Sequence, residues 1–80
     1  MKFKIKKFRR ENGIDYWDHI GRHEVIFSGY GDNAVAKIGY TSLTSVFSVA
    51  MNEEYIEISG FRREPPDYTY EYWMVRCFKR

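Results

Sequence analysis

The sequence predicts an α+β fold, in which an antiparallel sheet of four to six strands has one helix packed on one face. Three observations lead to this prediction. Apolar and polar residues alternate with a period of two along several segments, as they do in half-buried strands. One segment instead repeats its apolar residues at helical spacing. Gly, Asn and Pro clusters join the segments by short connections, which favour antiparallel pairing.

The chain of 80 residues predicts a single domain, residues 1–80, with a small and dense core. Aromatic residues make up 19% of the chain, and each of them removes a large area from water when it is buried. The charged fraction of 30% is ordinary for a soluble globular protein.

The first predicted strand covers residues 1–8, where Phe3 and Ile5 alternate with lysines. Asn12-Gly13 then predicts a tight turn, because both residue types tolerate positive φ. Residues 14–20 form either the returning strand or a short helical turn, and their pattern fits both.

The next two strands, residues 22–30 and 34–40, are predicted to form a hairpin. The first has the β-rich apolar centre Val25-Ile26-Phe27, and the second alternates apolar and polar side chains. A cluster of turn-forming residues at positions 29–33 lies between them.

The predicted helix covers residues 43–51, and Thr41 or Ser42 can cap its first turn. The evidence is a set of apolar residues at i, i+3, i+4, i+7 and i+8, which share one helical face: Leu43, Val46, Phe47, Ala50 and Met51. The β-branched residues of this stretch lower its helix propensity. The helix therefore depends on packing against the sheet.

Two final strands, residues 55–61 and 68–79, are separated by Pro65-Pro66. Proline cannot continue a ladder because it lacks the amide hydrogen. In the last strand Val75 and Cys77 alternate onto the face that is predicted to be buried. The predicted order of elements is β-(β)-β-β-α-β-β.

The charge is uneven along the chain, although the formal net charge is only +2. Six of the first ten residues are basic: Lys2, Lys4, Lys6, Lys7, Arg9 and Arg10. A concentrated positive edge can attract a polyanion. The rest of the chain is net acidic, unlike the uniformly basic surface of dedicated nucleic-acid domains.

The fragment Phe-Arg-Arg-Glu occurs twice, at residues 8–11 and 61–64. Both copies lie where a predicted strand gives way to a turn, and the segments around them do not match. We therefore interpret them as two strand ends and not as a repeated unit. They nevertheless place four arginines on two loops: Arg9, Arg10, Arg62 and Arg63.

The sheet face turned away from the predicted helix carries the candidate partner-binding residues. One helix covers only part of a wide sheet, so the opposite face meets solvent or a partner. The candidates on this face are Tyr55, Tyr70, Tyr72, Met74 and Arg76, with the four arginines of the two loops at its rim. Tyr and Arg are enriched at protein interfaces, and Met adapts to irregular surfaces.

The tyrosine-rich face also fits two roles that need no protein partner. Tyrosine has a high β propensity and can simply cover an open sheet. The same mixture of side chains can instead stack bases and hold phosphates, as sheet faces do in some RNA-binding folds. The residue pattern leaves both possibilities open.

No cluster of residues predicts catalysis, a metal site or a cofactor. His19 and His23 are four residues apart, but Gly21 lies between them in a region of turn and strand character, and no cysteine pair supports them. Gly29-Tyr30-Gly31 is not followed by the GK[ST] of a phosphate loop. Cys77 is predicted to be a small buried hydrophobe and not a reactive thiol.

The sequence also predicts the cellular compartment of the protein. A single cysteine excludes a disulfide within the chain and disfavours a secreted scaffold. No apolar run reaches the roughly 18 residues of a membrane span, and lysines interrupt any signal-peptide core at the N-terminus. We expect a cytoplasmic protein that does not bind membranes.

Together these observations predict a small non-enzymatic protein-binding module, an inhibitor or regulator of a larger protein machine. Small phage and mobile-element proteins are often of this kind, which is an analogy of size and style only. The alternative is a nucleic-acid-binding protein that uses the basic N-terminal strand and the arginine-rich loops.

Overall fold

The computed structural model describes all 80 residues as one antiparallel sheet of seven strands, without an α-helix. The strands are β1 (Phe3–Glu11), β2 (Ile14–His23), β3 (Val25–Ser28), β4 (Val35–Ile38), β5 (Thr41–Met51), β6 (Tyr55–Arg62) and β7 (Glu71–Phe78). One 3-10 turn, η1 (Gly31–Asn33), connects β3 to β4. The predicted α+β class is therefore wrong, and the sheet has seven strands instead of the predicted four to six, whereas the antiparallel arrangement of a small domain is confirmed.

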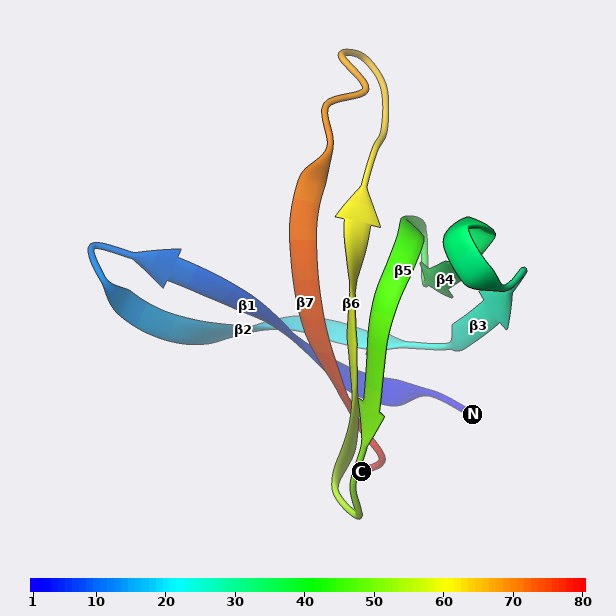
Figure 1. Cartoon of the computed structure of the whole chain (residues 1–80). Helices are drawn as coiled ribbons and strands as arrows, with labels where there is room; N and C mark the ends of the chain where they lie inside the picture. Colours follow the sequence, from blue (N-terminus) through cyan, green and yellow to red (C-terminus); the bar gives the residue numbers. More distant parts are fainter.

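The sheet is rolled, because its two end strands are consecutive in the chain. The strand order is β2-β1-β7-β6-β5-β4-β3, and only Glu24 separates β2 from β3. In Figure 1 the chain passes behind β7, β6 and β5 as it runs from one end of the sheet to the other. At this junction the Gly39 amide donates to the Glu24 carbonyl over 3.2 Å.

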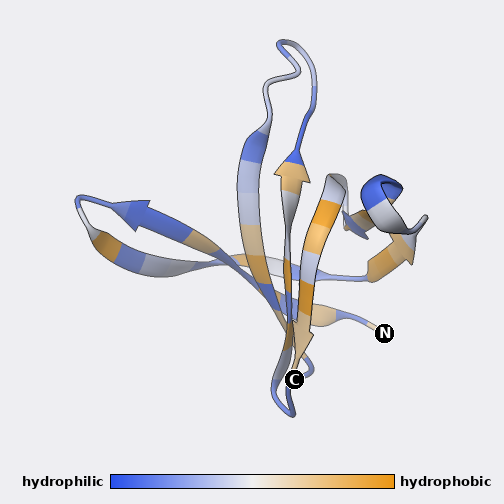
Figure 2. Cartoon of the chain, in the orientation of Figure 1, coloured by the Kyte–Doolittle hydropathy of each residue, from blue (hydrophilic) through white to orange (hydrophobic).

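The core lies on the inner face of the rolled sheet, which packs against itself. The buried apolar residues come from five strands: Ile5, Ala36, Ile38, Leu43, Ile58, Val75 and Cys77. Figure 2 shows hydrophobic bands in the central parts of the strands and a hydrophilic outer half of β1. Because the sheet supplies both walls of the core, no helix is needed to cover it.

The predicted alternation of the first and last strands is confirmed. Ile5 lies opposite Cys77 in the β1–β7 ladder, and Ile58 lies opposite Val75 in the β6–β7 ladder. Residues directly opposite each other in an antiparallel pair share a face. The residues that alternate with these core residues along each strand consequently point outward.

The helix predicted over residues 43–51 is wrong, because this segment is strand β5. Leu43 is buried and Val46 packs against the core, but Phe47 is 60% exposed and Met51 is 69% exposed. The β-branched residues that weaken a helix favour a strand. β4 and β6 supply the hydrogen-bonding partners on the two sides of its first half.

A bulge in β5 explains why its apolar residues have helical spacing. Thr44 lies opposite Phe61 and Ser48 lies opposite Ser59, so three residues of β5 face Gly60 alone. Ser45 has a φ of 51°, and such extra residues bend a strand and change which face its side chains occupy. A Cβ at Gly60 would lie 3.3 Å from the Thr44 carbonyl oxygen, a tight contact, so the bulge packs closely against this glycine.

Several other boundaries differ from the prediction. Residues 14–20, which fitted either a strand or a helical turn, belong to β2. The predicted strand over residues 22–30 is divided at Glu24 between β2 and β3, and β7 begins at Glu71 instead of residue 68. The tight turn at Asn12-Gly13 is confirmed, with φ values of 53° and 76°.

Burial predicts losses of stability of different size for two substitutions in β5. Leu43→Ala should reduce the free energy of unfolding by about 2–5 kcal/mol, because it opens a cavity in the core. Phe47→Ala should cost only about 0.5–1.5 kcal/mol, the contribution of stacked aromatic rings, because Phe47 is mostly exposed. Chemical denaturation of both variants measures this. A larger loss for Phe47→Ala than for Leu43→Ala would contradict the assignment of this segment to a strand.

Candidate protein-binding surface

The outer face of β5, β6 and β7 carries most of the predicted partner-binding residues. The β6–β7 ladder pairs Tyr55 with Phe78, Glu57 with Arg76, Ser59 with Met74 and Phe61 with Tyr72. These pairs alternate with the pairs that contain Ile56 and Ile58, which face the core. Tyr55, Tyr72, Met74 and Arg76 therefore lie on the same outward-facing surface, as predicted.

Four aromatic side chains meet at one end of this face and form the aromatic cluster: Phe47, Phe61, Tyr70 and Tyr72. Phe61 is central, with ring centroids 5.7 Å from Phe47 and 6.1 Å from each tyrosine. The Phe47 ring also stacks on Tyr72 at 6.0 Å. Tyr70 is 59% exposed and Tyr72 is 43% exposed. The cluster is thus ordered by its own contacts while it stays open to solvent.

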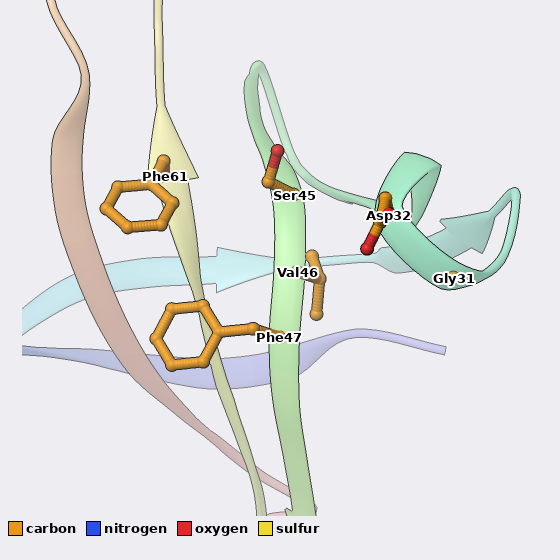
Figure 3. A pocket seen from close by; sticks show the side chains of 6 residues that line it. All are labelled: Gly31, Asp32, Ser45, Val46, Phe47 and Phe61. Atoms are coloured by element: carbon orange, nitrogen blue, oxygen red, sulfur yellow. The ribbon is translucent and has the colours of Figure 1, made fainter.

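An open hollow of about 800 Å³ adjoins the aromatic cluster. It is lined by Gly31, Asp32, Ser45, Val46, Phe47 and Phe61. Figure 3 shows the Phe47 and Phe61 rings on one side of β5 and the Asp32 side chain reaching from η1 toward β5. The hollow therefore combines an apolar wall with one carboxylate.

Arg76 joins three strands at the other end of the outer face. Its guanidinium carbon lies 4.0 Å from the Trp17 ring centroid and 4.6 Å from that of Tyr55. Its Nε donates to Glu57 Oε2 over 2.9 Å. Because this guanidinium is stacked on two rings and paired with a carboxylate, Arg76 holds β2, β6 and β7 together more than it offers a free charge.

The structure does not bring the four predicted rim arginines together. Arg9 and Arg10 lie in the β1–β2 hairpin, which projects from the sheet, whereas Arg62 and Arg63 lie where β6 ends. Of the four, only Arg63 is next to the aromatic cluster, with its guanidinium carbon 4.9 Å from the Tyr70 ring centroid. The two copies of Phe-Arg-Arg-Glu are thus separate strand ends with different surroundings.

Three of these arginines are neutralised by neighbouring carboxylates. Arg9 Nε lies 2.7 Å from Asp18, Arg10 Nε lies 2.6 Å from Asp15, and an Arg62 nitrogen lies 2.8 Å from Glu64. The side-chain hydrogen bonds from Arg9 and Arg10 hold the pKa values of Asp18 and Asp15 below their usual range. Asp15 and Asp18 consequently stay charged and compete with any external anion for these arginines.

Three aromatic residues of the outer surface were absent from the sequence-based candidates. Phe61 follows Tyr55 and Glu57 at even spacing, so simple alternation along residues 55–61 could have placed it there. Phe47 was assigned to the core because of its helical spacing. Trp17 lay in the segment whose structure the pattern left open, and it reaches this face only because β2 pairs with β1.

The two histidines do not converge on a common centre. His19 lies opposite Lys6 and is exposed. The ring of His23 is partly buried against Gly39, and its Nε2 lies 3.1 Å from the Ile20 carbonyl oxygen. No group of three or more His, Cys, Asp or Glu side chains is arranged to hold a metal ion.

Comparison with models of protein families, with curated protein sequences and with solved structures finds no match for this chain. The structure contains no helix with the length and apolar character needed to cross a membrane.

Cys77 is fully buried among the core residues, as predicted, and burial raises the pKa of its thiol to about 12. The native thiol is therefore neutral and shielded near neutral pH. An Ellman-type reagent at about pH 8 should label it no faster than the chain unfolds, and immediately in denaturant. Prompt labelling of the native protein would contradict its burial.

The same pKa predicts a loss of stability in alkaline solution. The thiol of the unfolded chain ionises near its ordinary pKa of 9.0, whereas the native thiol keeps its proton up to about 12. The contribution of Cys77 to the free energy of unfolding is therefore complete below pH 9 and decreases as the pH rises toward 12. Denaturation curves of the wild type and Cys77→Ala across this range isolate the effect, because the variant lacks the group. A constant difference between the two proteins would refute it.

Proposed function

We propose that this protein is a non-enzymatic protein-binding module, in which the aromatic cluster of the outer face contacts the partner. The single observation that supports this most strongly is the contact of four aromatic rings on a surface where Tyr70 and Tyr72 remain 59% and 43% exposed. Tyrosine is enriched among the hot spots of protein interfaces. An inhibitor or regulator of a larger protein machine in the cytoplasm is the role we propose for such a module.

The geometry favours binding because the aromatic side chains are already held in place. Tyr72 is restrained by Phe47 and Phe61, and Tyr70 is restrained by Phe61 and by Arg63. Rings fixed before binding lose little conformational entropy when a partner covers them. The interface therefore gains most of the free energy of burying these rings.

The adjoining hollow suggests what the partner presents. An apolar side chain of the partner would contact Phe47, Phe61 and Val46, which line the hollow. A basic side chain next to it would face Asp32, whose carboxylate has no ion pair in the chain. The preferred partner segment thus combines an apolar residue with a neighbouring Lys or Arg.

Nucleic-acid binding through the basic N-terminal strand remains the alternative, and the ion pairs make it weaker. Arg9 and Arg10 are neutralised within the β1–β2 hairpin. Lys2 and the three lysines of β1 form no ion pair, but Lys7 stacks on Trp73 at 4.7 Å. Few cations near the aromatic cluster are therefore free to hold phosphates while its rings stack bases.

Replacing Tyr70 and Tyr72 together by Ala should weaken partner binding by more than about 2 kcal/mol, the scale of interface hot spots. The melting temperature should change much less, because both tyrosines lie outside the core. Tyr40→Ala is the matched control, since Tyr40 is 99% exposed and lies outside the aromatic cluster. Partners captured from a host lysate treated with nuclease provide the binding assay. Equal losses for the control and the double variant would contradict the proposed surface.

Titration with labelled single- and double-stranded oligonucleotides at two salt concentrations separates the two functions. Protein binding predicts weak association that does not compete with the captured partner. Nucleic-acid binding predicts micromolar or tighter affinity that falls steeply with salt and is lost when Lys2, Lys4, Lys6, Arg9 and Arg10 are all replaced. That second result would replace the proposed function with the alternative.

A further inference from the structure

The second half of β5 is an edge strand with only one partner. β4 pairs with residues 41–43 of β5, and the Val46 amide donates to the Ala34 carbonyl over 3.1 Å. Residues 48–51 pair with β6 alone, and Phe47 lies in the bulge and has no ladder partner. The backbone of this segment therefore leaves hydrogen-bonding groups unpaired along the side away from β6, where Figure 1 shows the lower half of β5 at the margin of the front strands.

Beyond the bulge, this edge lacks the charges and prolines that normally keep an exposed strand from pairing. All five residues from Phe47 to Met51 are exposed, and three of them are large and apolar: Phe47, Val49 and Met51. The whole of β5 contains no charged residue and no proline. By contrast, the end strand β2 carries Asp15, Asp18 and Arg22, and such charges discourage pairing between edges.

We propose that residues 47–51 pair in antiparallel fashion with the same residues of a second copy of this chain. A strand without charges meets no like charge when it pairs with itself, which is not true of β2. A register centred on Val49 places Val49 opposite Val49 and Ser48 opposite Ala50. Valine then opposes valine and small residues oppose small ones, which are compatible cross-strand pairs.

The symmetry of this pairing has a consequence for the outer face. An antiparallel pair of identical strands is related by a two-fold axis, and an isologous interface of this kind is the commonest in homo-oligomers. When the axis is perpendicular to the sheet, the outer faces of both copies lie on the same side. The two aromatic clusters would then share one continuous sheet. The dimer itself does not depend on the proposed function.

Sedimentation equilibrium of the wild type over a range of concentrations tests the pairing. We expect a reversible dimer, and we expect Val49→Lys to weaken it at least about tenfold, because the two-fold axis places the two lysines opposite each other. Val49 is 51% exposed in the single chain, so circular dichroism should show that the variant folds. Ile26→Lys is the matched control: Ile26 is 54% exposed and lies on the end strand β3. This control should leave the dimer intact.

A mixture of Val49→Lys and Val49→Glu makes the test specific to this register. Each variant alone should be largely monomeric, and the equimolar mixture should recover the dimer through opposite charges across the axis. Independently of any variant, amides of residues 47–51 in the wild type should exchange more slowly as protein concentration rises. A wild type that stays monomeric, a dimer that survives Val49→Lys, or a mixture that stays monomeric would overturn the proposal.

Discussion

The direct passage of the chain from β2 to β3 is the constraint on which the rest of this structure depends. Since only Glu24 separates the two end strands, the sheet must roll until its ends are neighbours. The inner face then supplies both walls of a core with seven buried apolar residues. A chain of this length cannot build a large core, and rolling one sheet encloses apolar side chains without using residues for a helix.

Rolling the sheet also determines what remains outside. Aromatic residues that alternate with the core residues cannot turn inward, so they lie on the outer face and contact one another. The bulge at Ser45 adds Phe47 to that face, and the start of β7 adds Tyr72, with Tyr70 just before it. The aromatic cluster and the uncharged edge of β5 thus meet at Phe47. The cluster offers side chains to a partner, and the edge offers backbone groups.

The fold changes the role that the sequence suggests for the basic residues near the N-terminus. The six basic residues near the N-terminus form a positive run in the sequence. Pairing of β1 with β2 places acidic residues next to the two arginines, and the resulting ion pairs reduce their attraction for a polyanion. Proximity in the fold therefore outweighs proximity along the chain, since salt screens charges at a protein surface beyond about 10 Å.

The sequence by itself determined the features that depend on local alternation and turn chemistry. These are the buried positions of Ile5, Ile58, Val75 and Cys77, the turn at Asn12-Gly13, and the outward direction of Tyr55, Tyr72 and Arg76. Only the tertiary structure decided that residues 43–51 form a strand, that Phe47 joins the outer face, and that the arginines have carboxylate partners. The physical reason is that a bulge imitates helical spacing in sequence, whereas the partners of Arg9 and Arg10 are set by the register in which β1 pairs with β2. The rolled sheet, and not local propensity, selects those contacts.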